Sequence, residues 1–155
     1  MAVSMTGAFV LPADRQTVWE HLNDAATLKA AIPGCESLER ISATEYRAVT
    51  KLKIGPVSAR FKGKVSLTDI DAPNSYRIQG EGEGGVAGFA KGGAAVTLRD
   101  AEGGTELSYA LEAQVGGKIA QLGARLIDAS AKKIAREFFD NFASVLGGTA
   151  AQQGT

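Results

Sequence analysis

The chain has 155 residues, of which 45% are hydrophobic, and its 17 Lys and Arg residues balance 17 Asp and Glu residues. These values fit one globular domain with a hydrophobic core, and zero net charge gives no global field that would attract nucleic acid. One cysteine and one histidine exclude an internal disulfide and argue against an all-protein zinc site. No apolar run approaches the roughly 20 residues of a membrane helix, and a signal-peptide pattern is missing, so we expect a cytoplasmic, metal-free protein.

The N-terminal third predicts one strand followed by two short helices. An apolar segment at residues 5–11 comes first, and Asp14 is a typical N-cap for the helix "RQTVWEHLND", where Trp19 and Leu22 recur at helical spacing. The segment "AATLKAAI" predicts a second helix that ends at "PGC", residues 33–35.

Residues 36–116 alternate with a period of two and predict about six strands joined as hairpins. The phase of one strand slips near Asp69, which predicts a bulge. The turn at residues 71–74 then sets the next register, and it places Lys64 opposite Glu81, Lys62 opposite Glu83 and Phe61 opposite Gly84.

Beyond Gly117 the period returns to 3.6, and apolar residues from Ile119 to Val145 predict one helix of about 30 residues. We assign residues 1–147 to a single domain and residues 148–155 to a flexible tail. The layout is α+β: a curved antiparallel sheet of about seven strands around a long C-terminal helix, with two short helices after the first strand. Such a sheet leaves a space beside the helix in which apolar ligands bind.

The stretch "GEGEGGVAGFAKGG", residues 80–93, contains the G-x-G-x-x-G spacing of a dinucleotide site. A strand follows these glycines instead of a helix, and Glu81 and Glu83 would repel a pyrophosphate, so we reject a nucleotide site. Gly80, Gly82 and Gly84 stand at inward positions of a strand. Two explanations stay open: the C-terminal helix approaches closely there, or the space is kept for a ligand.

Other side chains offer weaker signals of chemistry. His21 and Cys35 have no partner nearby in sequence that would form a catalytic pair, so we assign no catalytic residue. Phe89, between small residues near a hairpin tip, is a candidate gate for a cavity or a membrane contact. The candidate docking patch for an acidic partner is a set of basic residues on the outer face of the sheet: Lys51, Lys53, Arg60, Lys62 and Lys64.

Several segments together resemble the family of the carbon monoxide dehydrogenase G subunit: "AIPGCESLE", "IGPVSARFKGKVSLTD", "GEGEGGVAGFAKGGAAVTL" and "GGKIAQLGARLIDASAKKIAREFFDNF". The resemblance spans about residues 5–146 and implies a helix-grip fold of the START-like and Bet v 1-like (SRPBCC) superfamily. It also implies a non-enzymatic accessory protein of a molybdenum hydroxylase, with transient contact at the inner membrane. The resemblance implies that the protein has no molybdenum, flavin or iron–sulfur site and no covalent cofactor. It implies instead a bound quinone or lipid.

We therefore expect a cavity that takes a quinone or lipid-like molecule, with Tyr109 supplying one polar contact. The predicted lining residues are Phe61, Gly82, Gly84, Val96, Tyr109, Leu122 and Leu126. One alternative is a ligand-free docking module that holds the molybdenum hydroxylase through the basic patch. The other is a small cyclase or hydrolase, which would need two inward polar groups within hydrogen-bonding distance.

Overall fold

The computed structural model describes residues 1–153, which form one antiparallel sheet of eight strands, three α-helices and two short 3₁₀ helices. The strand order is β2-β3-β4-β5-β6-β7-β1-β8, so β2 to β7 are consecutive hairpins and β1 returns to pair with β7. The strands are β1 (Ala2–Leu11), β2 (Cys35–Arg40), β3 (Glu45–Ile54), β4 (Val57–Asp71), β5 (Ser75–Glu83), β6 (Phe89–Ala101), β7 (Gly104–Gly116) and β8 (Ala151–Gln152).

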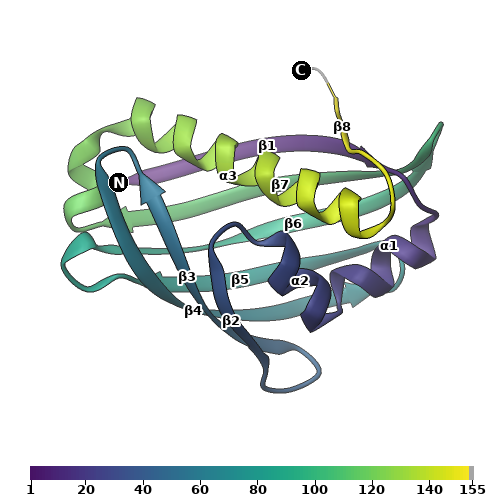
Figure 1. The fold of residues 1–155 in the computed structure, drawn as a ribbon, viewed down its shortest axis with the longest axis horizontal. Helices are drawn as coiled ribbons and strands as arrows, with labels where there is room; N and C mark the ends of the chain where they lie inside the picture. The colour runs from purple at the N-terminus through teal and green to yellow at the C-terminus, as the bar shows by residue number, and fades with distance from the viewer. Residues whose placement is uncertain (154–155) are drawn as a thin grey trace.

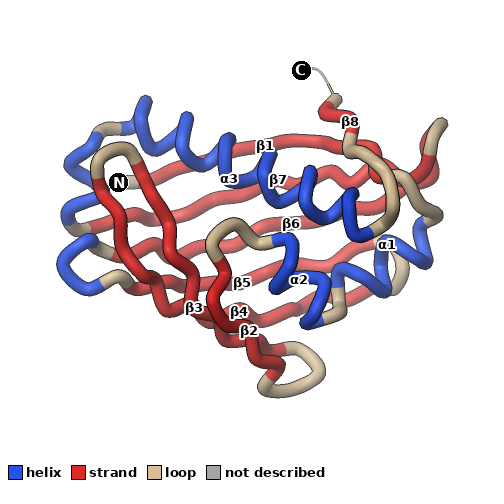
Figure 2. The backbone as a smooth tube through the Cα atoms, in the orientation of Figure 1, coloured by secondary structure: helices blue, strands red, loops and turns tan. Residues whose placement is uncertain are grey.

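The long helix α3 (Ala124–Val145) lies across one face of this sheet, and α1 (Arg15–Leu22) and α2 (Ala25–Ala31) cover the same face near its C-terminal end (Figures 1 and 2). The apolar stripe of α3 faces the sheet, where the Phe139 ring stacks on Phe9 of β1 with 4.3 Å between ring centroids. The predicted α+β helix-grip arrangement is confirmed.

The start of the long helix differs from the prediction. The apolar residues after Gly117 form a 3₁₀ helix, η2 (Lys118–Leu122), and α3 begins only at Ala124 and has 22 residues. Gly123, with φ of +91°, separates the two, and such a left-handed conformation cannot continue an α-helix. Hydrophobic periodicity misses this break because η2 also turns apolar side chains inward; Ile119 is 2% exposed.

The predicted pairing of β4 with β5 is confirmed for both charged pairs, because Lys64 lies opposite Glu81 and Lys62 opposite Glu83. The irregularity predicted near Asp69 is also present. Asp69 has φ of +50°, and the register shifts before the strands pair again at Asp71. A local irregularity in a long antiparallel pair increases twist, which helps the sheet curve around α3.

The glycines of β5 do not make room for the helix. A Cβ atom added at Gly80 would lie 3.7 Å from its nearest neighbours, and one at Gly82 would lie 4.0 Å from its only neighbour. None of those neighbours belongs to α3, so the explanation by close helix approach is wrong at these two positions.

Gly84 and Gly7 each lie under an aromatic ring. Gly84 follows the end of β5, and a Cβ there would come within 2.6 Å of the Phe61 ring, so the predicted juxtaposition of Phe61 and Gly84 is confirmed. Gly7 of β1 is covered in the same way by Tyr109, whose hydroxyl oxygen would lie 2.6 Å from an added Cβ. A ring folded over a bare strand position protects the backbone and fixes the ring's orientation.

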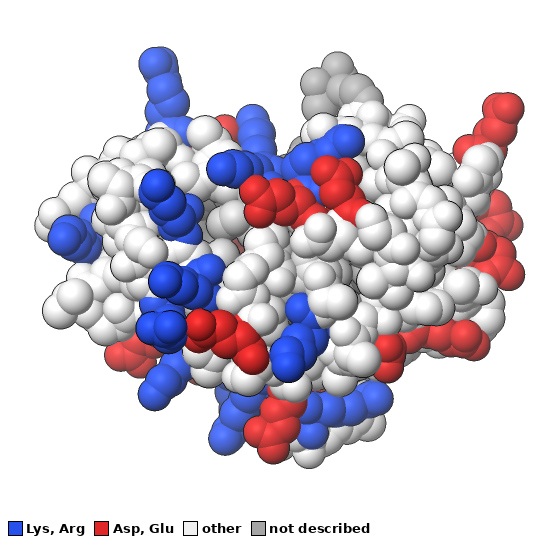
Figure 3. Space-filling model, viewed as in Figure 1, with Lys and Arg blue, Asp and Glu red and all other residues white. Residues whose placement is uncertain are grey.

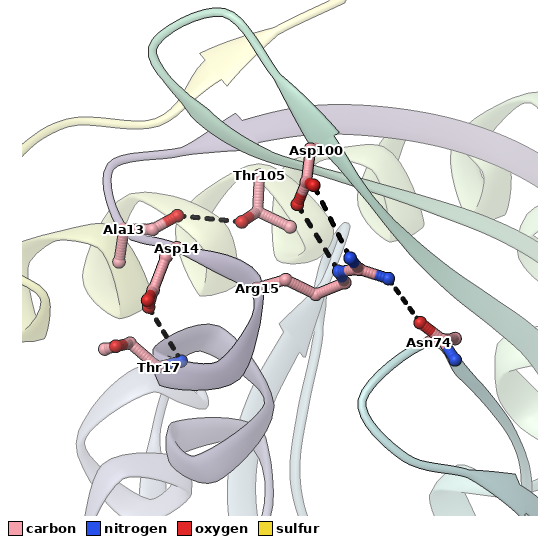
Figure 4. A network of polar contacts seen from close by, with 7 residues as sticks. All are labelled: Ala13, Asp14, Arg15, Thr17, Asn74, Asp100 and Thr105. Carbon is pink, nitrogen blue, oxygen red and sulfur yellow. Dashed lines mark hydrogen bonds and ion pairs between the residues drawn. The ribbon is translucent and has the colours of Figure 1, made fainter.

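The start of α1 is held by polar contacts (Figure 4). The predicted N-cap is confirmed: the Thr17 backbone N–H donates to Asp14 Oδ1 at 3.0 Å, and hydrogen bonds from Thr17 lower the pKa of the Asp14 carboxyl. Behind the cap, the buried Thr105 hydroxyl donates to the Ala13 carbonyl oxygen at 2.8 Å. The chain entering α1 is therefore tied to β7.

Arg15 extends this network to two neighbouring segments (Figure 4). Its guanidinium donates to the Asn74 side chain in the β4–β5 turn, and its Nε lies 3.3 Å from Asp100 Oδ1 on β6. One side chain thus joins α1 to both segments at this end of the sheet.

Part of the segment predicted as a flexible tail, 148–155, packs on the sheet. Ala151 lies opposite Val10 and Gln152 opposite Phe9, so β8 extends the edge next to β1. Ala150 is buried, and Arg136 donates to the Gln152 side chain at 3.3 Å. Residues 154–155 of the predicted tail lie outside the described residues, and the domain boundary at residue 147 stays a prediction.

The buried hydrophobic residues form two clusters. The larger one, the central core, joins α1, α2 and the C-terminal half of α3 to the sheet through residues such as Phe9, Val18 and Phe142. The smaller one, which we call the η2 cluster, fills the other end of the molecule. Its buried members are Phe61, Ala87, Val115, Ile119 and Ile127.

We expect alanine substitutions at Gly82 and Gly84 to have opposite effects on the free energy of unfolding. Gly84→Ala should lower the free energy of unfolding by about 1–3 kcal/mol, because the new Cβ displaces the Phe61 ring. Gly82→Ala should raise it by about 0.5–1 kcal/mol, because no atom blocks the Cβ and the unfolded chain loses freedom. Urea denaturation of both variants measures this. Equal destabilisation would contradict the described packing.

Candidate functional site

An apolar cavity of about 490 Å³ lies between the sheet, α3 and the two short helices. Its wall carries no charged side chain, and the only polar side-chain groups on it are three tyrosine hydroxyls. The lining residues are Met5, Leu22, Leu28, Ile32, Pro33, Leu38, Tyr46, Ala48, Val65, Leu67, Tyr76, Ile78, Ala94, Val96, Leu107, Tyr109, Leu111, Ala131, Ile134, Ala135, Phe138 and Phe139. A space of this size and chemistry suits a drug-sized apolar molecule.

The cavity exists because small side chains face it from both sides. Ala131 and Ala135 are one helical turn apart on α3, and Ala48 and Ala94 face the cavity from β3 and β6. Leucine or phenylalanine at such positions would fill the space, because protein interiors pack to the density of organic crystals. The alanines therefore keep the volume open.

The three tyrosines on the wall differ in their surroundings. The Tyr46 hydroxyl donates to the Asn23 carbonyl oxygen at 3.2 Å. Tyr109 is half-buried, folds over Gly7 and stacks on Phe139 at 5.9 Å, and burial raises the pKa of its phenol. Tyr76 is 7% exposed, and burial, with a smaller effect of Tyr46, raises its pKa far above the ordinary value. The cavity wall is therefore uncharged at neutral pH.

A groove of about 470 Å³, which we call the helix groove, runs between α3 and the segments that face it, β3 and the α2–β2 loop. It shares Pro33 and Ile134 with the apolar cavity. Unlike the cavity, it carries charges. Its charged residues are Lys51, Lys53, Lys133 and Glu137.

A second groove, the outer groove, has a volume of about 610 Å³ and lies where the side chains of β4 and β5 point away from α3. Phe89 is one of its lining residues. The charged residues that line it are Arg47, Lys62, Lys64, Glu81, Glu83 and Lys91. Basic side chains outnumber acidic ones there, so an acidic surface would be attracted locally despite zero net charge.

The charges visible in Figure 3 are unevenly distributed. Basic side chains gather over the half of the molecule that contains the β3–β4 hairpin, and acidic side chains predominate at the end that contains α1. This face of the molecule is therefore electrically polar along its length while the net charge of the chain is zero.

Cys35 and His21, the two residues weighed for covalent or acid–base chemistry, contact backbone carbonyls. The Cys35 thiol donates to the Ser37 carbonyl oxygen at 3.3 Å, and partial burial raises its pKa, which disfavours the nucleophilic thiolate. His21 Nδ1 lies 2.8 Å from the Thr17 carbonyl oxygen in its own helix. Neither residue lines the apolar cavity.

Residues 1–153 hold neither a grouped set of metal ligands nor a membrane-spanning helix. No three His, Cys, Asp or Glu side chains in this range lie close enough together to bind a metal ion. Among the helices of the same range, none combines the length and the hydropathy that crossing a membrane requires.

A match to a known protein family identifies relatives of this chain. A family model for the carbon monoxide dehydrogenase G subunit (CoxG) matches residues 7–147. The chain belongs to the CoxG family. The resemblance seen in the sequence is thereby confirmed, and this is a family of accessory subunits. Among curated proteins, no sequence match is found.

Solved structures resemble this CoxG family member over nearly the whole chain. A conserved protein from Geobacillus kaustophilus has 29% sequence identity and a TM-score of 0.89, with 98% of this chain and 100% of the other covered. A protein from Rhizobium leguminosarum has 17% identity and a TM-score of 0.70, with 95% of each chain covered. Ara h 8.0201 has 12% identity and a TM-score of 0.64, with 96% and 100% covered, and shares the Bet v 1-like helix-grip fold.

The structure brings only two of the predicted lining residues to the cavity of this CoxG protein, Val96 and Tyr109. Phe61 and Leu122 pack in the η2 cluster instead, and Gly84 lies under the Phe61 ring. The break at Gly123 explains why these residues do not line the cavity. The 3₁₀ helix η2 fills the end of the molecule where the prediction had placed a continuous α-helix beside a cavity.

The other two predicted lining residues lie in the grooves. Gly82 lines the outer groove. Leu126 lines the helix groove and packs over Gly55 in the β3–β4 turn, where an added Cβ would lie 2.6 Å from its methyl carbon. Whether any of these residues contacts a ligand stays a prediction.

The candidate gate and the candidate docking patch are also redistributed. Phe89 is 48% exposed and lies at the outer groove with its ring against Gly116, away from the cavity wall. Lys62 and Lys64 line the outer groove, whereas Lys51 and Lys53 line the helix groove. The last patch residue is paired within the chain.

That residue is Arg60, whose Nε donates to Glu36 Oε1 at 2.7 Å. This hydrogen bond and the guanidinium charge hold the pKa of Glu36 below its usual value. Arg60 is thus less available to a partner than Lys51, Lys53 and Lys62, and Lys64 has a looser ion pair, with its Nζ 4.0 Å from Glu45 Oε1.

The prediction missed the wall contributed by α1, α2 and β2, including Leu22, Leu28 and Leu38. It also omitted Tyr46 and Tyr76 from the cavity, although the strand alternation places both inward. The sequence contained the signal for these tyrosines, because their strand positions point inward and a buried hydroxyl needs a hydrogen-bond partner. No local pattern indicates that the two short helices close over that part of the sheet.

We expect stability at high pH to depend on Tyr76. Because burial raises its pKa, the folded state holds the phenolic proton more tightly than the unfolded state, so this contribution is complete below about pH 10 and is lost at higher pH. Between about pH 9 and about pH 11, wild type should lose more stability than Tyr76→Phe. Denaturation at a series of pH values measures the difference. Parallel curves for the two proteins would contradict the burial of this phenol.

Proposed function

We propose that this protein is a non-enzymatic accessory protein of a molybdenum hydroxylase of the carbon monoxide dehydrogenase type. In this proposal it binds a hydrophobic molecule such as a quinone or lipid and links the enzyme to the membrane. The family and the Bet v 1-like fold support a ligand-binding accessory protein. The observation that carries the ligand proposal is the uncharged cavity of about 490 Å³.

The cavity favours binding by burial of apolar surface. A ligand that buries about 300 Å² of apolar surface would gain about 7.5 kcal/mol from transfer, before the costs of association. A body of drug size fits the cavity. A longer tail would extend along the helix groove, which shares Pro33 and Ile134 with the cavity.

The wall chemistry supports binding without catalysis. General acid–base or nucleophilic catalysis needs a titratable or nucleophilic group beside the reacting atoms. The cavity is lined by aliphatic and aromatic side chains with three phenols, and burial keeps two of those, Tyr76 and Tyr109, in their neutral form.

Transient membrane contact is supported by exposed apolar residues near η1 (Gly85–Ala87). Val86 in this turn is 93% exposed, and Phe89 at the start of β6 is 48% exposed. Exposed apolar side chains that lie close together are typical of surfaces that meet another apolar phase. In this proposal the protein touches the inner membrane with this end, and a hydrophobic molecule passes along the helix groove, because the η2 cluster fills the interior beside η1.

We expect Ala135→Phe to prevent uptake of menaquinone-4 from phosphatidylcholine vesicles, with the bound amount falling about tenfold, because the added ring occupies the cavity. Val86→Asp should reduce uptake from vesicles but leave uptake from a dilute aqueous dispersion unchanged. Sedimentation of the vesicles, followed by chromatography of the protein fraction, measures both.

Val145→Phe is the matched control for the first variant, because it adds a ring at a residue of α3 that is 43% exposed. If wild-type protein takes up no quinone and no lipid, ligand binding is refuted. If Val86→Asp behaves as wild type with vesicles, the membrane contact of η1 is refuted.

A second candidate function is a docking module that needs no ligand, and the outer groove favours it. The groove joins Arg47, Lys62, Lys64 and Lys91 on a sheet face that no helix covers. A surface of this charge would attract an acidic face of the molybdenum hydroxylase.

In that case, the double variant Lys62→Glu/Lys64→Glu should abolish capture of the molybdenum hydroxylase in a pull-down, whereas Ala135→Phe should leave it intact. The control is Lys29→Glu/Lys132→Glu, which changes the net charge equally on α2 and α3. Loss of capture with this control as well would show that net charge, and not the outer groove, determines binding.

A further inference from the structure

Tyr76 places a hydroxyl group on an otherwise apolar part of the cavity wall. It lies on β5 directly opposite Val96 of β6, and both residues line the cavity. The side chain is 7% exposed and packs edge-on against the Trp19 ring, with 5.3 Å between centroids. Its ring is therefore fixed in position by neighbours from α1 and the sheet.

The Tyr76 hydroxyl has no protein partner among residues 1–153, unlike that of Tyr46, which donates to the Asn23 carbonyl oxygen. Every side-chain nitrogen or oxygen in this range that is cut off from any free space has a hydrogen-bond partner. The Tyr76 hydroxyl oxygen is therefore in contact with free space, and the cavity that Tyr76 lines is free space of this kind. A ligand that fills this space displaces water from the hydroxyl, and a donor left buried without a partner is costly, so a ligand that brings an acceptor is favoured.

The chemistry of the group defines what it can recognise. Because burial raises the pKa of the Tyr76 phenol, it stays protonated at physiological pH and offers an O–H donor instead of a negative charge. An anionic ligand group would have to be desolvated in this uncharged wall without a cation to pair with. A carbonyl oxygen meets neither obstacle.

We propose that the Tyr76 hydroxyl is the hydrogen-bond donor that selects ligands with a neutral acceptor, such as a carbonyl, on an apolar body. This inference rests on the proposed ligand-binding function and assigns the polar recognition to Tyr76, in place of the Tyr109 contact that the sequence suggests. Tyr109 folds over Gly7 at the β1–β7 pair, where its hydroxyl is only half-buried.

A pair of compounds with one carbon skeleton tests the inference. The compound 2,3-dimethyl-1,4-naphthoquinone carries two carbonyl groups, and 2,3-dimethylnaphthalene carries none. Both ring positions next to the carbonyls are blocked, so the quinone cannot add the Cys35 thiol. Equilibrium dialysis followed by chromatography gives the affinity of each compound for wild type and for Tyr76→Phe, which keeps the ring and removes only the hydroxyl.

We expect Tyr76→Phe to weaken binding of the quinone about 3- to 10-fold, the loss of one hydrogen bond, and to change binding of the hydrocarbon less than about twofold. Tyr46→Phe and Tyr109→Phe should change the two affinities by the same factor. Trp19, the single tryptophan of the chain, reports occupancy beside Tyr76 through its fluorescence.

The possible outcomes separate the two proposals. If wild type binds both compounds but Tyr76→Phe affects them equally, the role of Tyr76 is refuted and the ligand-binding function stands. A selective loss of quinone binding in Tyr109→Phe instead would assign recognition to that residue and also refute the inference. If wild type binds neither compound, the ligand-binding function itself is refuted and the inference fails with it.

Discussion

The structure depends on one constraint: the apolar stripe of α3 must be buried by a sheet that is a single layer. A helix of 22 residues is too long to be covered by α1 and α2, so the strands curve around it and Phe139 stacks on Phe9 of β1. The bulge at Asp69 and the glycines of β5 lower the resistance of the sheet to this curvature. Elements far apart in the chain are thereby held around one interior.

A single helix on a curved sheet cannot fill that interior evenly, and the two ends solve the problem differently. At one end, η2 folds back and the η2 cluster closes the gap with Phe61 and Ile119. Toward the other end, alanines on α3 face alanines on the sheet, and the cavity remains between them. The cavity volume depends on small residues on both sides, because a larger side chain on either α3 or the sheet would fill the space left by the alanines opposite.

The same architecture places charged side chains on one face of the sheet and apolar side chains on the other. The alternation of each strand sends lysines and glutamates to the outer groove and apolar residues to the cavity, so a mostly basic groove and an uncharged cavity lie on opposite faces of one sheet. Substitutions can therefore change the groove and the cavity independently. The three tyrosine hydroxyls on the cavity wall are the exceptions to this separation, and that of Tyr76 is the one to which we assign the proposed ligand recognition.

The sequence by itself determined the fold class, the order of the elements and the β4–β5 register, because these depend on local periodicity, turn residues and cross-strand charge pairs. The N-cap at Asp14 and the ring of Phe61 beside Gly84 were predictable for the same reason. Only the tertiary structure decided where the free volume lies. The break at Gly123 gives no signal in the hydrophobic periodicity, since η2 and α3 both turn apolar residues inward. Because of this break, Phe61 and Leu122 pack in the η2 cluster and do not line the cavity as predicted. Likewise, Tyr46 and Tyr76 were predictably inward, but only the tertiary structure gave the Tyr46 hydroxyl a partner, the Asn23 carbonyl oxygen, and placed Tyr76 on the cavity wall without one.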